Sequence, residues 1–315
     1  MSDIMTCMPF GQLMEWVLQE KSGKDTVFGV HRPYTINADH NLTIFERTLE
    51  TPVGPAAGPH TQLAQNIIAS YYAGARFFEL KTVQKMDGAE LSACVNKPCI
   101  LADDEGYNCE WSTELTVPDA MSEYIKAWFI LHVMAKEFNL GAQDGFQFNI
   151  SVGYDLEGIK GDKVNTFIDG MMEAKDTAVF QECKKWLLDN ADRFHNFTRE
   201  DIEAIPSDVC NSATISTLHG CPPQEIESIA NYLLTEKHLN TFVKCNPTLL
   251  GYDFARKTMD EMGYDYMVFG DFHFRDDLQY EDAVPMLTRL MKLSEELGLE
   301  FGVKITNTFL LTLQK

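Results

Sequence analysis

The chain has 315 residues, with 26 Lys and Arg against 47 Asp and Glu, so its formal net charge is −21. So acidic a protein would repel a phosphate backbone, which excludes nucleic acid as an expected partner. Hydrophobic residues make up 45% of the sequence, enough for a sizeable core, yet no stretch approaches the roughly 20 apolar residues of a membrane span. The N-terminal residues lack the basic and apolar parts of a secretory signal, so we expect a cytoplasmic protein without membrane contact.

The eight cysteines are scattered along the chain, and no CxxC pair occurs. Without an export signal they are expected to be reduced thiols, and the absence of CxxC argues against an iron–sulfur cluster within these residues. Asp271, His273 and Asp277 share one polar loop, but their spacing is not diagnostic of metal binding. We therefore predict no metal ligands.

The first fifty residues predict a helix and a hairpin. Residues 9–21 place their apolar side chains on one helical stripe, and residues 42–49 alternate apolar and polar side chains as a half-buried strand does. We assign residues 1–50 to an N-terminal helix and hairpin packed on the main fold.

Residues 51–60 crowd three prolines, two glycines and two alanines into ten positions. Small residues let a flat ligand approach the backbone, whose N–H groups can then bond it. The alternative is an ordinary connecting loop, because Gly and Pro are common there.

Strands and helices alternate through the rest of the sequence. Strands are expected at 76–83, 146–152, 213–217, 241–245, 266–269 and 301–305. Helices are expected at 61–72, 120–138, 164–205, 222–237, 254–262 and 282–297. Turns or polar loops are expected at 153–160 and 270–277, and a long loop over the active face at 84–118. Such alternation implies a parallel sheet. With about seven strands and no GxGxxG after the first, we predict an α/β fold of the TIM (β/α)8 type rather than an open sheet.

Residues 212–248 form the most informative stretch, with a strand, a turn, a helix and a second strand. Pro222 and Pro223 suit a first helical turn, which puts Cys221 at or near the helix N-cap. Unpaired N–H groups and the helix dipole should push a thiol there towards the thiolate. The two strand ends, which open on the ligand-binding side of a parallel sheet, carry Ser216, Thr217, His219, Cys221, Lys244 and Asn246. A buried structural cysteine in a plain βαβ unit is the alternative.

The motifs PVGPAAGP, ELKTV, FNIS, STLHGCPP, FVKCNPT and GVKITNT follow one another in this order. Together they resemble the FMN-binding barrel of the dihydropyrimidine and dihydroorotate dehydrogenases. Over about residues 4–308 the chain is similar above all to the N-terminal part of large bacterial oxidoreductases named as selenate reductase subunits. The resemblance implies an FMN-dependent oxidoreductase, in which hydride passes at flavin N5 while a cysteine moves a proton.

The resemblance also implies a role for particular residues. The flavin would be contacted by Ala56, Ala57, Gly58, Lys81, Thr82, Asn149, Lys244, Thr306, Asn307 and Thr308, and the substrate by Asn149, His219 and Asn246. Cys221 would be the catalytic acid/base. A rival alignment sets Cys245 in that role, but we prefer Cys221 because of its expected helix-cap position. The two Asn residues that would grip a pyrimidine around this cysteine are absent, so a pyrimidine substrate is not implied.

In the similar proteins, further barrel units follow the T-N-T motif and hold the flavin phosphate, whereas here residues 309–315 end the sequence. We expect residues 51–315 to be a barrel truncated before its last strands, through a truncation or frameshift after Thr308. The large similar proteins also carry an NAD(P)H and FAD region with iron–sulfur clusters, so an electron-transfer domain or subunit is an expected partner beside a small-molecule substrate. The alternatives are a non-catalytic or nonfunctional barrel fragment, and a flavin-free barrel lyase with Lys81 or Lys244 as Schiff-base amine.

Overall fold

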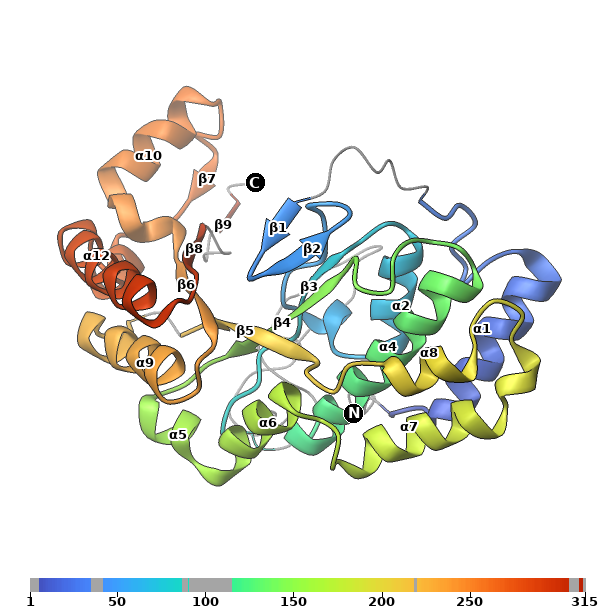
Figure 1. The fold of residues 1–315 in the computed structure, drawn as a ribbon. Helices are drawn as coiled ribbons and strands as arrows, with labels where there is room; N and C mark the ends of the chain where they lie inside the picture. Colours follow the sequence, from blue (N-terminus) through green and yellow to red (C-terminus); the bar gives the residue numbers. More distant parts are fainter. Residues whose placement is uncertain are drawn as a thin grey trace. The chain divides into compact units, whose positions relative to one another are not determined.

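The structure is a computed structural model, and it describes residues 6–34, 42–86, 90, 115–217, 220–305 and 312–313. Most of the loop expected at 84–118 lies outside these ranges. The chain divides into two compact units: the first unit is Met1–Ser151 with Lys160–Asn211, and the second unit is Val152–Ile159 with Ser212–Lys315. Figure 1 traces the elements of both units along the chain.

The first unit begins with the expected helix and hairpin. Helix α1 (Phe10–Lys24) buries Phe10, Leu13, Met14 and Val17, the side chains of the predicted apolar stripe. Strands β1 (Leu42–Ile44) and β2 (Arg47–Leu49) pair antiparallel, as a hairpin requires. Its turn places Phe45 and Glu46 at positive φ (53° and 61°), the conformation that matches the right-handed twist of the two strands.

Two parallel strands and a layer of helices make up the rest of the first unit. Strand β3 (Phe77–Glu79) pairs with β4 (Gln147–Val152). The helices are α2 (Ala64–Tyr72), α4 (Val117–Glu137), α6 (Asp162–Met172), α7 (Ala178–Asp189) and α8 (Arg199–Ala204), with short 3-10 turns at Pro59–Thr61 and Ala191–Arg193. Helix α4 packs against α2, α6 and α7 and is the centre of this layer.

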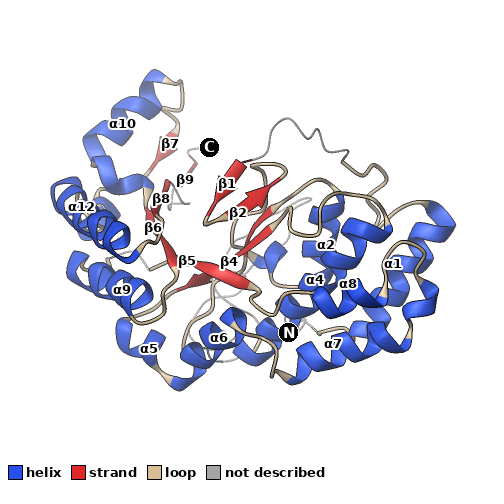
Figure 2. Cartoon of the chain, in the orientation of Figure 1, coloured by secondary structure: helices blue, strands red, loops and turns tan. Residues whose placement is uncertain are grey.

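The second unit repeats the strand–helix alternation. Its parallel strands are β5 (Cys210–Ile215), β6 (Asn240–Cys245) and β8 (Phe301–Ile305), and its longer helices are α9 (Pro223–Thr235), α10 (Tyr252–Glu261) and α12 (Tyr280–Leu297). Helix α9 packs on β6 and α12 packs on β8, and the two helices contact each other. Figure 2 shows both helices (blue) along one side of these strands (red). The parallel sheet has the strand order β3-β4-β5-β6-β8, which confirms the expected α/β alternation.

The short strand expected at 266–269 is present as β7 (Met267–Val268). It pairs antiparallel with β9 (Thr312–Leu313), so the expectation that it joins the parallel sheet was wrong. Strands of a parallel sheet are buried on both faces, whereas Val268 is 40% exposed.

The two segments expected as turns or loops contain short helices, α5 (Leu156–Lys160) and α11 (Phe272–Asp276). In α11 the buried ring of Phe274 packs on Tyr252 and Phe269. This packing stabilises a helix in a segment whose composition is typical of a polar loop.

The hairpin lies at the amino ends of the first unit's strands. Arg47 donates hydrogen bonds to the carboxylate of Asp208 (2.7 Å) and to its carbonyl oxygen (2.9 Å). Asn211, near the start of β5, donates its side-chain N–H to the Phe45 carbonyl (2.7 Å) and accepts one from Gln147 at the start of β4 (3.2 Å). The carboxyl ends of these strands are therefore the ends at which a ligand site is expected.

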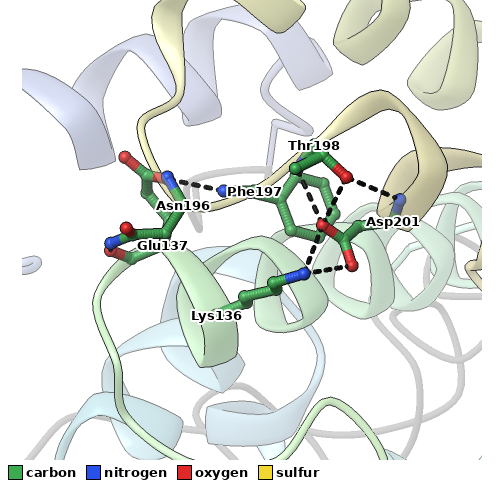
Figure 3. Close-up of polar contacts among 6 residues, drawn as sticks. All are labelled: Lys136, Glu137, Asn196, Phe197, Thr198 and Asp201. Carbon is green, nitrogen blue, oxygen red and sulfur yellow. Dashed lines mark hydrogen bonds and ion pairs between the residues drawn. The ribbon is translucent and has the colours of Figure 1, made fainter.

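The region expected to be helical at 164–205 is divided into separate helices by capping residues. Thr198 and Asp201 form a capping box at the start of α8. Lys136 at the end of α4 contacts both oxygens of Asp201 at 2.6 Å (Figure 3). The carboxylate of Glu137 accepts the backbone N–H groups of residues 195–197. Together these contacts fasten the segment before α8 to the end of α4.

Candidate functional site

In the first unit, strands β3 and β4 separate an apolar face from a polar face. Phe78 and Phe148 are register partners, and the Phe148 ring lies 5.3 Å from that of Trp128 on α4. Side chains alternate between the faces of a strand, so Glu79 and its register partner Asn149 point away from α4. Asn149 is fully buried and Glu79 is 6% exposed. The polar face is thus built into the interior of the unit.

Lys81 continues this polar face just beyond β3. Its side chain is buried, with only 3% exposed. The Leu80 N–H donates to the Asn149 carbonyl (2.9 Å), so the backbone pairing of β3 with β4 extends to the residue before Lys81. The Lys81 carbonyl accepts the Tyr124 hydroxyl (3.0 Å), which fixes its backbone. The Thr82 hydroxyl lies 2.7 Å from that of Ser151. The structure therefore places Lys81 and Thr82 just beyond the carboxyl end of β3, and Asn149 within the neighbouring strand β4.

The small-residue segment before α2 has a structural task as well. A Cβ on Gly54 would lie 1.4 Å from the Phe77 carbonyl oxygen, so the segment can run beside β3 only because residue 54 is glycine. Two of the N–H groups considered for a ligand already have acceptors: that of Ala57 donates to Glu79 (3.2 Å) and that of Gly58 to the Thr61 hydroxyl (3.1 Å). Ala56 is exposed.

In the second unit, Cys221 directly precedes Pro222, the N-cap of α9. The expected thiolate is contradicted. Burial raises the pKa of the Cys221 thiol; a hydrogen bond with Thr217 opposes this, and the carboxylates of Glu225 and Asp155 add to it. Cys221 is accordingly a protonated thiol near neutral pH.

The cause lies in the residues that follow Cys221. Pro222 and Pro223 have no N–H groups, so the first two donors that could stabilise a thiolate at this helix end are missing. Of the N–H groups that follow, those of Glu225 and Ile226 donate to the Pro222 carbonyl at 3.0 and 3.1 Å. The prolines that start the helix therefore also weaken the effect that was expected of it.

The two candidate cysteines lie in different surroundings. Cys245 ends β6, is 4% exposed, and its pKa is raised by burial. Lys244, the preceding residue, is half-buried and must face the other side of the sheet. Cys245 therefore points towards the helix-covered face, whereas Cys221 is partly exposed in a turn after β5. This placement favours Cys221 over Cys245 as a group that a ligand could reach.

Sequence reasoning missed the residue that organises the turn around Cys221. One oxygen of the buried Asp277 accepts the N–H of Gly220 (2.9 Å), and the other accepts the Thr248 hydroxyl (2.6 Å) and the Asn246 amide (3.3 Å). Gly220 has φ +80°, which favours glycine. Asn246, expected at the substrate, is thus held by Asp277, which had been considered only as part of a metal loop.

Further residues near these strand ends carried no recognisable signal. Tyr154, two residues after β4, has φ +91°, a strained conformation for a non-glycine residue that is often found at functional sites. Asp155 accepts the Gly158 N–H (2.7 Å), and Glu225 accepts the Leu156 N–H (2.7 Å). These carboxylates explain part of the electrostatic environment of Cys221.

Some predicted residues cannot be placed. His219, Thr306, Asn307 and Thr308 lie outside the described residues. Within the described ranges, no group of three or more His, Cys, Asp or Glu side chains is arranged to hold a metal ion, and the five cysteines there are all free thiols. None of the described helices has the length and apolar character needed to cross a bilayer.

Comparison with known proteins identifies relatives over almost the whole chain. Residues 28–315 match the family described as "Oxidoreductase YgfK, N-terminal TIM-barrel domain". The "Putative oxidoreductase YgfK" of Escherichia coli strain K12 is 46% identical over 322 residues, which cover 98% of this chain and 31% of the relative. The same protein of Escherichia coli O157:H7 matches equally. The chain therefore spans about a third of the length of these relatives.

Among solved structures, ligand-free DHODH from Eimeria tenella aligns with 94% of this chain and 81% of its own, at 11% identity and a TM-score of 0.41. DHODH from the same organism in complex with ferulenol gives 10% identity and a TM-score of 0.39 over 96% and 81%. TM-scores this low establish no common fold by themselves. The sequence matches are sufficient, and they confirm both the predicted fold class and the resemblance to large bacterial oxidoreductases: the chain belongs to the YgfK family of oxidoreductases, and residues 28–315 correspond to the N-terminal TIM-barrel domain of that family.

Proposed function

We propose that this chain is the FMN-binding module of an oxidoreductase that acts on a small-molecule substrate and works with an electron-transfer domain or subunit. Membership of the YgfK oxidoreductase family is the observation that carries the proposal. The flavin itself rests on the sequence motifs that surround Lys81, Asn149 and Lys244. The alternative of a barrel without a cofactor remains an outcome of the test below.

The chemistry of the residues present fits the ring of a flavin. Its ring edge offers oxygen and nitrogen acceptors, and these suit the amino groups of Lys81 and Lys244 and the amide of Asn149. We assign Ala56, Ala57, Gly58, Thr82, Thr306, Asn307 and Thr308 to the same cofactor from the motifs. When bound, FMN would exchange a hydride at N5 with the substrate. A lysine beside the ring would stabilise the negative charge of its reduced form, which is a protein contribution typical of cofactor enzymes.

We assign Cys221 the role of general acid. Burial and the carboxylates of Asp155 and Glu225 disfavour its thiolate, so at neutral pH the thiol holds a proton that it can give. In substrate reduction, one carbon of a double bond would gain the hydride, and the neighbouring carbon would gain the proton from Sγ. The thiolate would then regain a proton from water. His219 and Asn246 are assigned to substrate contacts.

Flavin binding is tested by titrating FMN into the chain and following flavin fluorescence. We expect saturable quenching, and we expect the Lys81→Met and Lys244→Met substitutions each to weaken binding about tenfold, because a hydrogen bond from a charged donor contributes roughly 1.5–3 kcal/mol. Lys292→Met is the matched control, because the Lys292 side chain is 77% exposed. A chain that shows no saturable quenching, or variants that bind like the control, would contradict the proposal.

The protonation state of Cys221 can be measured without a substrate. The rate of its alkylation by iodoacetamide, followed by mass spectrometry from pH 6 to 10, should rise with an inflection above that of the same cysteine in the unfolded chain. Glu225→Gln should move the inflection down. A rate already at its plateau at neutral pH would identify a thiolate and contradict the assignment as acid.

A further inference from the structure

The backbone pairing of β3 with β4 is irregular directly beside Lys81. The Leu80 N–H donates to the Asn149 carbonyl (2.9 Å), and the Val83 N–H donates to the Ser151 carbonyl (3.0 Å). The two acceptors are two residues apart on β4, whereas the two donors are three residues apart on the β3 side. In a regular parallel pair the hydrogen bonds are evenly spaced along both strands. The β3 side therefore contains one extra residue at this point, which is a β-bulge.

The bulge changes the direction of the Thr82 side chain. Along a regular strand, Thr82 would face away from the side to which Glu79 and Lys81 project. Its hydroxyl instead lies 2.7 Å from that of Ser151, which projects from the same face of β4 as Asn149. The extra residue thus brings the Thr82 hydroxyl to the polar face. Bulges beside active sites re-aim side chains in this way.

Helix α4 holds the bulge from the other side through Tyr124. The Tyr124 side chain is fully buried, and its ring lies 6.2 Å from that of Phe167. Its hydroxyl donates to the Lys81 carbonyl (3.0 Å). Burial, with an addition from the Glu123 carboxylate, raises the pKa of Tyr124, so the phenol keeps the proton that it donates. The Lys81 N–H donates to the Thr61 carbonyl (3.4 Å). Both backbone groups of Lys81 are therefore bonded outside the pairing of β3 with β4.

We propose that Tyr124 is a positioning residue, whose hydroxyl holds the bulge in the form that presents Lys81 and Thr82 side by side on the polar face. A bulge disrupts the ladder of hydrogen bonds that fixes a regular strand, so a bond from a neighbouring helix has more influence here. The inference rests on the proposed function in one respect, that the ligand met by Lys81 is the flavin. A buried carbonyl needs a hydrogen-bond donor in any case, so the test must separate positioning from a merely structural role.

The chain offers a matched pair of substitutions for this test. Tyr124→Phe removes the hydroxyl and leaves the ring in place. Tyr71→Phe is the control, because Tyr71 is also fully buried in the first unit, while within the described residues its hydroxyl has no hydrogen-bond partner. Both substitutions keep the aromatic packing, and thermal unfolding of each variant verifies that it is folded.

The first measurement requires no flavin. Acetylation of the Lys81 amino group by N-hydroxysuccinimide acetate, followed by mass spectrometry, reports how firmly the bulge holds this buried side chain. We expect Tyr124→Phe to raise the rate about fivefold, the effect of losing one neutral hydrogen bond, and Tyr71→Phe to leave it at the rate of the parent chain. The exposed Lys292 is the internal reference. The inference is overturned if Lys81 reacts at the same rate in both variants.

The second measurement is a double-mutant cycle for FMN affinity. We expect Tyr124→Phe to weaken FMN binding about fivefold in the parent chain. In the Lys81→Met chain it should have little further effect, because the hydroxyl acts through Lys81. A merely structural role would weaken binding equally in both chains or in neither, and either result overturns the inference. If the parent chain does not bind FMN, the flavin proposal fails, and the acetylation rates alone decide whether Tyr124 positions Lys81.

Discussion

The two units differ in how they use their helices. In the first unit, fifteen of the 21 residues of α4 are buried, whereas α10 in the second unit buries none of its residues. Among the large apolar side chains of the second unit, many are at least 38% exposed, including Leu250, Phe254, Met262, Phe272, Tyr280 and Met291. Because burial of apolar surface is the main source of stability, the first unit should carry most of the folding free energy.

The largest expected effect comes from the buried ion pair of the first unit. Arg76 donates to Glu50 (2.9 Å) and to the carbonyls of Tyr71 (3.0 Å) and Leu140 (2.8 Å) while only 1% exposed. Arg76→Met would leave the buried Glu50 without its cation, and we expect a loss of about 3–5 kcal/mol in the free energy of unfolding, measured by urea denaturation.

The second unit provides the matched control for that substitution. Arg289 pairs with Glu227 at 2.7 Å, but its side chain is 60% exposed. Arg289→Met should therefore cost far less than Arg76→Met, because solvent screens such a pair. Equal losses in the free energy of unfolding for the two substitutions would contradict the inference that the first unit carries most of the folding free energy.

A glycine of the first unit should give the next largest effect. Gly54→Ala would drive a Cβ into the Phe77 carbonyl oxygen, and overpacking against backbone cannot be relieved by a side-chain rotation. We expect a loss of about 3 kcal/mol in thermal or urea unfolding. Gly23, in α1, has nothing within 4 Å of its added Cβ, and Gly23→Ala should stabilise the chain by about 0.5–1 kcal/mol. A neutral Gly54→Ala would mean that the segment beside β3 can shift freely.

The first unit should also be the acid-sensitive part of the chain. Burial, with a smaller contribution from Arg47, lowers the pKa of His132 from 6.5 to about 3, and within the described structure its Nε2 has no hydrogen-bond partner. The folded state therefore favours the neutral ring, so stability is fully present above pH 6.5 and falls as the pH drops towards 3. Each pH unit below 6.5 costs about 1.4 kcal/mol of folding free energy, which gives a loss of roughly 2 kcal/mol at pH 5. His132→Leu should flatten this pH dependence, and an unchanged slope would assign it to other groups.

The sequence was most informative where periodicity reports burial. The stripe of α1, the hairpin and the alternation of β4, β5, β6 and β8 with helices all follow from the spacing of apolar side chains. It was less informative where distant segments decide the outcome. The antiparallel partner of β7 comes from residues 312–313, and the packing of Phe274 converts a polar loop into a helix.

Two features of the candidate site could have been read from the sequence by a closer argument. The prolines after Cys221 start a helix, but their missing N–H groups also remove two of the donors that could stabilise a thiolate. The strands at 241–245 and 301–305 both contain Val-Lys just before their last residue, which predicts the observed register pairing of Lys244 with Lys304 once parallel pairing in register is assumed. The bond between Gly220 and Asp277 could not be predicted, because it joins residues 57 positions apart.

The smallest expected effect concerns the hydrogen bond from the Gly220 N–H to Asp277. This bond is a buried polar contact of the second unit, as the Arg76–Glu50 pair is of the first. Asp277→Asn keeps the size of the side chain but removes the charge that accepts from Gly220, Asn246 and Thr248. We expect a loss of only about 1–2 kcal/mol, and we expect it to be local. Hydrogen exchange should show the Gly220 amide losing roughly ten-fold or more of its protection, while amides of α4 keep theirs. If α4 loses protection to the same extent, the turn around Cys221 unfolds together with the first unit, and the stability of the two units is not separable.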